Sequence, residues 1–355
     1  MTVEIIGTGR AIPLRRVTNE ELAGKIDTSD GWIRSHTGIG SRHIADDDTA
    51  ASDLGAAAAL EALKLAVERG AAAEKTAAEL ALTVDLIVVG STTQDFFGHP
   101  ATACIVQHKL GAVNAAAMDI TQACSGFIYG IETAAALLKT DPRRRRALVI
   151  GTEVLSRIVN WEDRRNCVLF GDGAGAVLLE KTGEDSAEAP VSSGPGPAHT
   201  GRRGLLRTVL GADGSGWEYL MIRRGGSRNP WKKGEIVDTV PAIEMNGHAV
   251  YNFAVKVITE TIEKMLKEER ISAADLDLIV PHQANARIVQ AAAKRLKIPE
   301  EKFYLNIEEY ANTSSASIPI ALDELNRSGG LRRGSLVMTV GFGAGLTYGG
   351  NLIRW

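Results

Sequence analysis

One strand-like pattern occurs twice in the chain, and this repeat limits the possible folds more than any other feature. DLIVVGS at 85–91 resembles DLIVPHQ at 277–283, and ALVIGTEV at 147–154 resembles SLVMTVGF at 335–342. The members of the two pairs lie 192 and 188 residues apart. Each is a short apolar run bounded by polar residues or glycine, which is typical of a buried strand. A repeat at nearly constant spacing predicts a duplicated structural unit.

A further stretch lies between these strands in each copy. DITQACSGF, beginning at Asp119, falls on NIEEYANTS, beginning at Asn306. At the offset of 188 residues found for the second strand pair, Cys124 lies opposite Asn312, which is one residue out of step with aligning the two stretches from their first residues. We therefore expect Cys124 and Asn312 to occupy equivalent places in the two units.

Helical segments alternate with the strands. Residues 52–70 are Ala-rich, and the apolar residues of 250–266 recur every three or four positions, as on the buried face of a helix. This alternation predicts an α/β fold. The 355 residues exceed one ordinary domain of about 100 to 200 residues. We expect one half over 1–182, a second over 204–355, and a surface loop over 183–203, which is rich in Gly, Pro and Ser.

Charge and cysteine content argue against several classes of protein. The chain has 40 Lys and Arg against 43 Asp and Glu, so bulk charge does not favour nucleic acid as a partner. The three cysteines form no CxxC pair and have no histidine at metal-ligand spacing, which argues against a disulfide framework and against a metal site. No signal-peptide pattern and no apolar run of about 20 residues is present, so we expect a cytoplasmic protein that does not enter a membrane.

Cys124 is the candidate nucleophile. AMDITQAC is expected to form a strand that runs into a turn, and the following SGFIYGIETAAALLK is expected to form a helix. A helix N-terminus favours the thiolate, which is the form that attacks thioesters. The alternative is a small buried apolar residue, the usual role of a free cysteine. That alternative holds for Cys104 and Cys167, which lie in apolar surroundings.

His282 and Asn312 are candidate hydrogen-bond donors. His282 follows an apolar strand and precedes a helix, where open α/β sheets place ligand-facing residues. A surface histidine is the alternative for His282, and a turn or helix cap is the alternative for Asn312. The glycine-rich run at 341–350 would allow close approach of a ligand or would form a tight hairpin. GDGAGA at 171–176 lacks nucleotide-binding spacing and is interpreted as a turn.

A cysteine, a histidine and an asparagine in this order fit a papain-like protease as well as a thioester-handling enzyme. The CG[SA]C[WY] signature of the protease is absent, and a duplicated α/β chain is the wrong scaffold for it. Across its whole length the chain resembles β-ketoacyl-[acyl carrier protein] synthase III, of the thiolase superfamily. The resemblance rests on DGWIRSHTGIGSRHI, DITQACSGF, FGDGAGAVLLE, ADGSG, PHQANARI, NTSSASIPIALDE and GFGAGLTYG. It implies a thiolase-like five-layer αβαβα fold of two duplicated halves and a homodimer.

The resemblance also implies a reaction that initiates fatty acid synthesis. Cys124 would take the primer acyl group from acyl-CoA. His282 and Asn312 would bind the thioester carbonyl of malonyl-[acyl carrier protein] during decarboxylation, and the backbone N–H groups of Cys124 and Ala344 would form a second oxyanion site. The family usually has Gly at the position of Ala344. No cofactor is implied, because acyl-CoA and malonyl-[acyl carrier protein] are substrates.

Coenzyme A contacts follow from the same resemblance. Trp32 and Arg164 would sandwich the adenine, and Asn285 would contact the pantetheine arm. The chain departs from the common pattern at His36, usually Arg, and at His248, often Asn, both expected near the CoA channel. These two departures put the fine CoA contacts in question without affecting the chemistry.

An acidic carrier protein would be met by a basic helix face. Arg287, Lys294 and Arg295 lie on or just before the helix that follows His282, and they would offer cations to the carrier. The alternative is a solvated basic face.

The primer pocket is where the chain departs furthest from the family. His99 stands where the family often places a Phe from the partner subunit, with Phe96 and Phe97 close by, and Phe342 is retained beside the active site. The alternative function is a ketosynthase III-like condensing or acyl-transferring enzyme of secondary metabolism that uses a longer or unusual acyl-CoA. An acyl-CoA-binding protein that has lost catalysis is disfavoured, because all three chemical residues are present.

Overall fold

Two mixed β-sheets form the framework of the protein. The computed structural model describes residues 1–183, 202–235 and 241–355. The first sheet has the order β1 (Thr2–Ala11), β7 (Gly173–Thr182), β6 (Arg146–Glu153), β4 (Leu86–Gly90), β5 (Ala116–Ile120). The second has the order β11 (Leu278–Pro281), β12 (Leu336–Gly343), β13 (Thr347–Arg354), β8 (Gly204–Ala212).

Strand pairing in the two sheets follows one plan. In the first sheet β4 and β6 are parallel, and β7 pairs antiparallel with both β6 and β1. In the second sheet β11 and β12 are parallel, and β13 pairs antiparallel with both β12 and β8. The repeated strands of the sequence are therefore equivalent strands of two sheets, which confirms the duplication.

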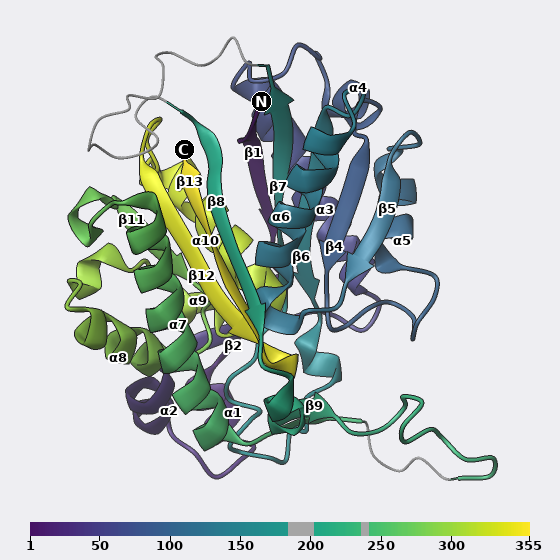
Figure 1. Cartoon of the computed structure of the whole chain (residues 1–355). Coiled ribbons are helices and arrows are strands. Elements are labelled where there is room, and N and C mark those ends of the chain that lie inside the picture. Colours follow the sequence, from purple (N-terminus) through teal and green to yellow (C-terminus); the bar gives the residue numbers. More distant parts are fainter. Residues whose placement is uncertain (184–201, 236–240) are drawn as a thin grey trace.

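Helices cover both faces of each sheet, so that five layers result (Figure 1). Long helices lie between the sheets and on the two outer faces (Figure 1). Within β4, Leu86 and Val88 pack against the middle layer, whereas Ile87 and Val89 pack against the outer layer. A strand that is buried on both faces needs a continuous apolar run, as the repeat contains. The middle helices are α6 (Gly126–Thr140) and α10 (Ser317–Ser328); the outer helices are α3 (Ala51–Glu68), α4 (Ala77–Ala81), α5 (Thr102–Leu110), α7 (Gly247–Glu269) and α8 (Ala286–Leu296).

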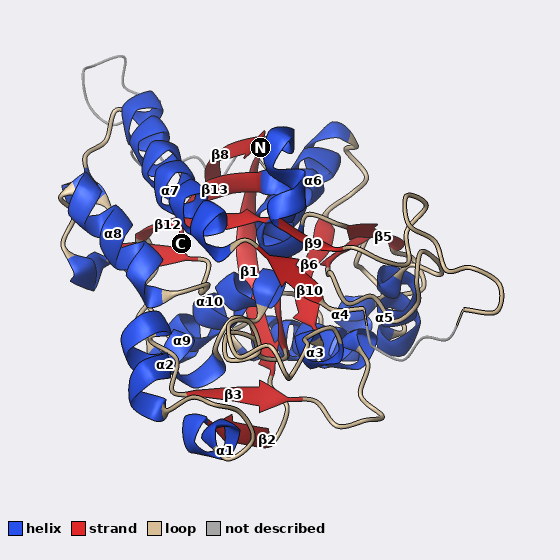
Figure 2. Cartoon of the chain, turned by 90° about the horizontal axis from the view of Figure 1, so that it is seen from below, coloured by secondary structure: helices blue, strands red, loops and turns tan. Residues whose placement is uncertain are grey.

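Small elements close one end of the layers, which is seen from below in Figure 2. There α2 lies beside α8, and an antiparallel pair of short strands runs next to α1. These elements are β2 (Arg15–Thr18), β3 (Ser41–Ile44), α1 (Asn19–Ala23), α2 (Asp30–Thr37), α9 (Ile307–Tyr310), β9 (Leu220–Ile222) and β10 (Ile243–Met245).

The structure corrects the register of the repeat. Ala123 and Ser314 each have a left-handed backbone, with φ of 45° and 48°, and each begins a 3₁₀ turn that leads into a middle helix. By this geometry Cys124 is equivalent to Ser315, and Asn312 lies three residues earlier. The alignment by sequence was wrong because α9 adds residues before the second turn that the first turn lacks.

Most of the predicted surface loop at 183–203 lies outside the described residues, because the structure does not describe 184–201. Among the helices that are described, none is both long and apolar enough to cross a membrane.

Candidate active site

Cys124 lies in the 3₁₀ turn between β5 and α6. The left-handed residue before it sharpens the turn, a conformation that is seen at functional sites. Gly343, at the end of β12, packs directly on this turn. A Cβ atom built on Gly343 would lie 2.9 Å from the Cys124 nitrogen and 2.7 Å from the Gln122 carbonyl oxygen. The second half therefore supports the nucleophile through a position that only glycine fits.

A cavity of about 230 Å³ opens at Cys124. It is smaller than the roughly 300 to 1,000 Å³ of cavities that hold drug-sized ligands. Most of its lining is apolar, and much comes from the β9–β10 hairpin and the segment after β6. The lining residues are Thr92, Thr121, Ala123, Cys124, Leu155, Ile158, Phe170, Leu220, Met221, Ile222, Ile243, Ser314 and Ala344. A short apolar group attached to the thiol would be shielded from water here.

The resting thiol of Cys124 is protonated. Burial raises the pKa of Cys124 to about 12, and the negative charge of Glu153 acts in the same direction, while Ser314 opposes both. The sequence predicted the opposite direction, from the nearby helix N-terminus. That prediction was wrong, because burial of the sulfur is the largest influence on its pKa. Formation of the thiolate therefore needs a group that accepts the proton.

Ala344 lines the same cavity as Cys124, as the second oxyanion site requires. Ala344 is not among the residues with positive φ, whereas the next residue, Gly345, has φ of 123°. An alanine therefore causes no backbone strain at position 344, and the left-handed conformation is left to glycine.

His282 is buried at the end of β11, with 1% of its surface exposed. Its Nδ1 lies 2.7 Å from Ser317 Oγ, and the Gln283 N–H donates to the same hydroxyl oxygen at 3.4 Å. Because the Ser317 oxygen accepts from Gln283, its own proton can go to Nδ1, which leaves the ring proton on Nε2. Nε2 is buried and has no hydrogen-bond partner within the described residues. The pKa of His282 is lowered to about 3 by burial, so the ring is a neutral donor without an acceptor.

Asn312 is fixed by its backbone and by its side-chain oxygen. Its N–H donates to the Leu169 carbonyl at 2.9 Å, and its carbonyl accepts from Gly171 at 3.0 Å. Its Oδ1 accepts from the Ser314 N–H at 2.8 Å, which identifies the other side-chain atom as the amide donor. Asn312 is thus linked through Ser314 to the cavity wall, and His282 is linked to Ser317 in the same stretch of chain.

Trp32 and Arg164 are neighbours, as predicted. The guanidinium carbon of Arg164 lies 5.9 Å from the centre of the Trp32 ring, and Arg164 also pairs with Asp27. A base stacked between them would need about 7 Å, twice the usual contact distance of ~3.5 Å, so this gap is too narrow for the predicted adenine sandwich as it stands. His36 stacks on Trp32 at 4.4 Å, and its Nδ1 lies 2.8 Å from the Trp32 carbonyl oxygen.

Asn285 and His248 have local hydrogen-bond partners. Asn285 caps α8 by accepting from the Arg287 N–H at 2.9 Å, and its amide donates to the His36 carbonyl at 3.1 Å. His248 lies in the first turn of α7, with Nε2 3.1 Å from the Asn252 amide nitrogen. The structure thereby brings Asn285, His36 and Trp32 together where α2 meets α8 (Figure 2).

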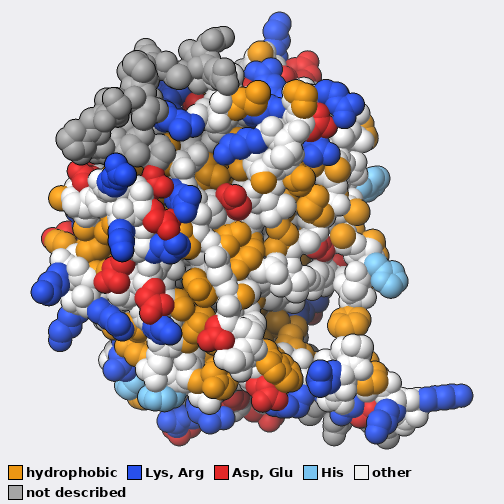
Figure 3. All heavy atoms as spheres, viewed as in Figure 1, with side chains coloured by type: hydrophobic (Ala, Val, Ile, Leu, Met, Phe, Trp, Pro, Cys, Tyr) orange, Lys and Arg blue, Asp and Glu red, His pale blue; other side chains and the backbone are white. Residues whose placement is uncertain are grey.

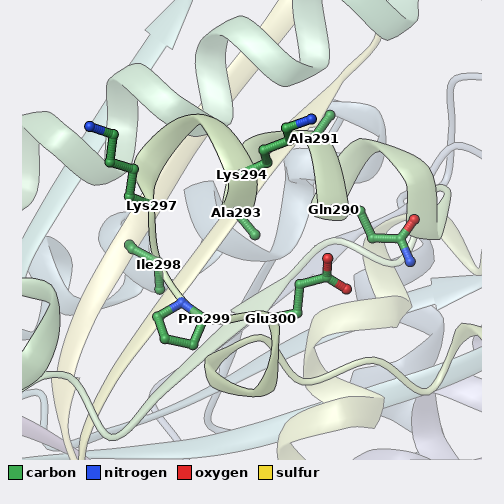
Figure 4. A pocket seen from close by; sticks show the side chains of 8 residues that line it. All are labelled: Gln290, Ala291, Ala293, Lys294, Lys297, Ile298, Pro299 and Glu300. Carbon is green, nitrogen blue, oxygen red and sulfur yellow. The ribbon is translucent and has the colours of Figure 1, made fainter.

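Arg287, Lys294 and Arg295 are all exposed on α8. Arg287 and Lys294 are seven residues apart, which places them on one face of the helix. None of the three forms an ion pair within the described part of the chain, and α8 contains no acidic residue. Figure 4 shows Lys294 and Lys297 extending from the end of α8, beside an open depression. Acidic side chains are interspersed with basic ones over the region of α7 and α8 (Figure 3).

The residues predicted for the acyl pocket do not line the cavity within this chain. Phe97 is 83% exposed, and His99 is also exposed, on the segment before α5. Phe342 is buried and packs edge-on against His282 at 5.5 Å, so it supports the histidine. The cavity wall instead comes from residues that sequence analysis missed, because the β9–β10 hairpin is nearly 100 residues from Cys124 in sequence.

Comparison with known proteins fixes the family. A sequence model described as 3-oxoacyl-[acyl-carrier-protein (ACP)] synthase III matches residues 118–193, and its C-terminal counterpart matches 266–355. A β-ketoacyl-[acyl-carrier-protein] synthase III from Clostridium acetobutylicum is 42% identical over 100% of this chain and 99% of its own length. The chain belongs to the β-ketoacyl-[acyl-carrier-protein] synthase III family.

Other members of the synthase III family agree. The relative from Natranaerobius thermophilus is 45% identical over 99% of each chain. The crystal structure of the synthase III from Aquifex aeolicus is 38% identical and covers 99% of this chain and 100% of its own, with a TM-score of 0.83. The priming β-ketosynthase of the R1128 polyketide pathway is 32% identical and covers 99% and 96%, also with a TM-score of 0.83. These matches confirm the predicted fold and the condensing acyltransferase class, and they do not favour the secondary-metabolism alternative.

Proposed function

We propose that this synthase III condenses an acyl-CoA primer with malonyl-[acyl carrier protein] through an acyl-Cys124 intermediate, with release of carbon dioxide, as the first condensation of fatty acid synthesis. The observation that supports the proposal is that the structure has both a cysteine at an apolar cavity and a buried histidine donor without an acceptor. The thiol of Cys124 lines a small apolar cavity with Ala344, and His282 presents an unpartnered neutral donor while it contacts Ser317, three residues after the cavity residue Ser314.

In the first half-reaction Cys124 attacks the acyl-CoA carbonyl. Negative charge develops on the carbonyl oxygen, and the N–H groups of Cys124 and Ala344 are donors for it. The coenzyme A thiolate leaves, and the acyl group stays on the sulfur. The apolar cavity wall then shields the thioester from water.

In the second half-reaction malonyl-[acyl carrier protein] loses carbon dioxide. The resulting enolate carries charge on its thioester oxygen, and His282 Nε2 and the Asn312 amide stabilise this charge more than the ground state. A neutral histidine suits this role, because it donates without being consumed as a base. The enolate carbon attacks the acyl-Cys124 carbonyl, and the thiolate is expelled.

Coenzyme A is proposed to enter past α2 and α8. Trp32 and Arg164 separate to take the adenine, and Asn285 releases the His36 carbonyl to contact the pantetheine arm. His36 stays stacked on Trp32, and His248 lies at the start of α7 beside the entrance.

The acyl carrier protein is proposed to dock on α8. Arg287, Lys294 and Arg295 have no ion-pair partner within the described chain, so they can meet acidic side chains without first breaking a pair. Arg287→Glu is expected to raise the KM for malonyl-[acyl carrier protein] more than the KM for acyl-CoA.

A homodimer is proposed from the edge of the first sheet. β5 is the last strand of its sheet, and no described strand pairs with its outer edge. Phe96 and Phe97, which are 56% and 83% exposed, lie on the segment after β4, the neighbour of β5. An open edge and exposed aromatic rings favour burial against a second copy. Light scattering at micromolar concentration should report a dimer, and a stable monomer would contradict it.

Acetyl-CoA is proposed as the first primer and medium-chain acyl-CoA as the second, since the cavity is small. His99 would close the pocket from the partner subunit. His99→Phe should then change the dependence of kcat/KM on acyl chain length, and an unchanged profile would remove His99 from the pocket.

The overall proposal is tested by mixing the protein with acetyl-CoA and locating the adduct by mass spectrometry, then adding malonyl-[acyl carrier protein]. We expect acetyl on Cys124 and its transfer to the carrier as a 3-ketoacyl product. Cys104→Ser is the matched control: Cys104 is exposed, not buried as the sequence predicted, and it lies outside the cavity, so it should carry no acetyl group. Product formation without acylation of Cys124 would contradict the proposal.

A further inference from the structure

Glu153 is a buried carboxyl group that the reaction above does not use. It ends β6, is fully buried, and lies beside the catalytic turn. Its Oε2 accepts from the Thr92 and Thr93 hydroxyls, both at 2.8 Å, and from the Thr92 N–H at 3.0 Å. Thr92 also lines the Cys124 cavity. The carboxyl group is therefore held at the wall of the active site by donors to its oxygens.

The other oxygen, Oε1, accepts from the Thr92 N–H at 3.2 Å and also contacts Ser315. Ser315 Oγ lies 2.9 Å from Glu153 Oε1 and 2.8 Å from the Gly90 carbonyl oxygen. A hydroxyl has one proton, and a carbonyl oxygen can only accept. If Ser315 donates to Gly90, its contact with Oε1 becomes a hydrogen bond when Glu153 supplies the proton. Burial raises the pKa of Glu153, which agrees with a carboxyl group that can be protonated.

Ser314 lines the Cys124 cavity, and the next residue, Ser315, contacts Glu153. The Ser314 hydroxyl oxygen is buried and has no hydrogen-bond partner among the described residues. Burial raises the pKa of both Cys124 and Glu153, and the Ser314 hydroxyl opposes the shift at each of them. Because the Ser314 hydroxyl has no other hydrogen-bond partner, it can accept a proton from Cys124 while it donates its own proton to Glu153.

We propose that Glu153 takes the proton of Cys124 through the Ser314 hydroxyl and holds it while the acyl group is on the sulfur. This proposal rests on the proposed function and deepens it. Glu153 acts through Ser314, and so it is a positioning residue for the proton.

The proton balance is as follows. In the first half-reaction the Cys124 S–H bond breaks, its proton passes to Ser314, and the Ser314 proton passes to the Glu153 carboxylate. The sulfur forms its bond to the acyl carbon, and coenzyme A leaves as a thiolate that takes a proton from water. In the second half-reaction condensation expels the Cys124 thiolate. The Glu153 proton then returns through Ser314, and the resting thiol and carboxylate are restored.

Electrostatics favours this exchange over direct loss of the proton. A resting carboxylate beside the thiol opposes a second negative charge. When the proton moves from Cys124 to Glu153, the buried pair keeps a single negative charge throughout. The third ionisable group at the site, His282, is neutral and stays so. The residues that contact Glu153 from the end of β4 and from the turn before α10 are all uncharged. They are Ser91, Thr92, Thr93 and Ser315.

The test is the pH dependence of Cys124 acylation by acetyl-CoA, followed by rapid-quench mass spectrometry. Wild type should be acylated at a rate that changes little between about pH 6 and 8. Glu153→Gln should be slower by at least about tenfold at pH 7, with a rate that rises with pH toward the wild-type value. Carbon dioxide release from malonyl-[acyl carrier protein] should stay within about threefold of wild type.

Two further variants distinguish loss of the proton acceptor from a folding defect of Glu153→Gln. Ser314→Ala leaves every hydrogen bond of Glu153 described above in place and should give the same pH profile as Glu153→Gln. Asp172→Asn is the matched control, because Asp172 is also a buried acid, held by Ser156 and the Ala45 N–H, and it does not line the cavity. Its profile should equal that of wild type.

A wild-type pH profile in both Glu153→Gln and Ser314→Ala would overturn the proposal. So would an equal loss of acylation and decarboxylation at every pH, since that pattern indicates a purely structural role. Absence of any acyl-Cys124 in the wild type would instead overturn the proposed function.

Discussion

The turn at Cys124 and its counterpart at Ser315 have the same backbone and different chemistry. Each follows a left-handed residue, lies in a 3₁₀ turn, and leads into a helix of the middle layer. In the first half the turn presents a thiol to a cavity. In the second half the Ser315 hydroxyl contacts Glu153 and Gly90 of the first half, so it joins the two sheets. The two copies therefore share the backbone of the turn, but one copy holds the nucleophile and the other holds a structural contact.

The second half contributes its chemistry from either side of that turn. Asn312 lies three residues before Ser315, and His282 lies at the end of the strand equivalent to β4. The comparison therefore predicts that bond formation at the sulfur and decarboxylation can be disrupted separately.

Exchange of the two side chains gives the largest effect. Cys124→Ser should lose acylation by roughly 1,000-fold or more, because a hydroxyl forms no comparable anion population. Ser315→Cys should not become acylated when Cys124 is replaced by Ser, since its side chain faces Glu153 rather than the cavity. Intact-protein mass spectrometry after mixing with acyl-CoA measures both, and an adduct on position 315 would break the comparison.

Removal of the hydrogen-bond donors that the second half of the chain supplies should slow decarboxylation. His282→Ala or Asn312→Ala should lower decarboxylation by roughly 100-fold, the usual scale for removal of an oxyanion donor. Acyl-Cys124 should still form in both. Carbon dioxide release is the measurement, and wild-type release from both variants would contradict the assigned roles.

Two adjacent positions test how the second half supports the nucleophile. Gly343→Ala should lower acylation by roughly 100-fold, because its Cβ would lie 2.9 Å from the Cys124 nitrogen and displace the turn. Ala344→Gly should stay within about threefold in rate and lose roughly 0.5 to 1 kcal/mol of stability through backbone entropy. Acylation rates and thermal melts distinguish the two. Equal effects at both positions would mean that the close packing at Gly343 is not what matters.

The buried histidine predicts a pH dependence of stability. The pKa of His282 is about 3 in the folded state and near 6.5 when unfolded, so below pH 6.5 the unfolded state binds a proton that the folded state does not. This contribution to the free energy of unfolding is complete above pH 6.5 and falls by up to about 1.4 kcal/mol per pH unit toward pH 3. Urea unfolding at several pH values should show a shallower fall for His282→Gln. Exposed His108→Gln is the control, and equal slopes in all three proteins would contradict a buried neutral ring.

Much of the fold and of the candidate site could be predicted from the sequence, because these features depend on residues that are neighbours along the chain. The repeated apolar runs predicted the duplication, and the ends of predicted strands indicated Cys124 and His282, with Asn312 in the corresponding stretch of the second copy. The register of the repeat could not be derived, because α9 lengthens one copy before its turn. The pKa of Cys124 could not be predicted either, since burial of its sulfur depends on β9 and β10, which begin 96 and 119 residues later in the chain. Glu153 was missed, although a charged residue at the end of the apolar run ALVIGTEV was a usable signal.

The central claim is that the two halves carry separable half-reactions, and Cys124→Ala tests it most directly. The variant, shown by circular dichroism to be folded, is mixed with malonyl-[acyl carrier protein], and carbon dioxide release is measured with and without acetyl-CoA. We predict that decarboxylation continues within about tenfold of the wild-type rate while no acyl-enzyme and no 3-ketoacyl product form. Loss of decarboxylation together with acylation in the folded variant would contradict the division between the halves.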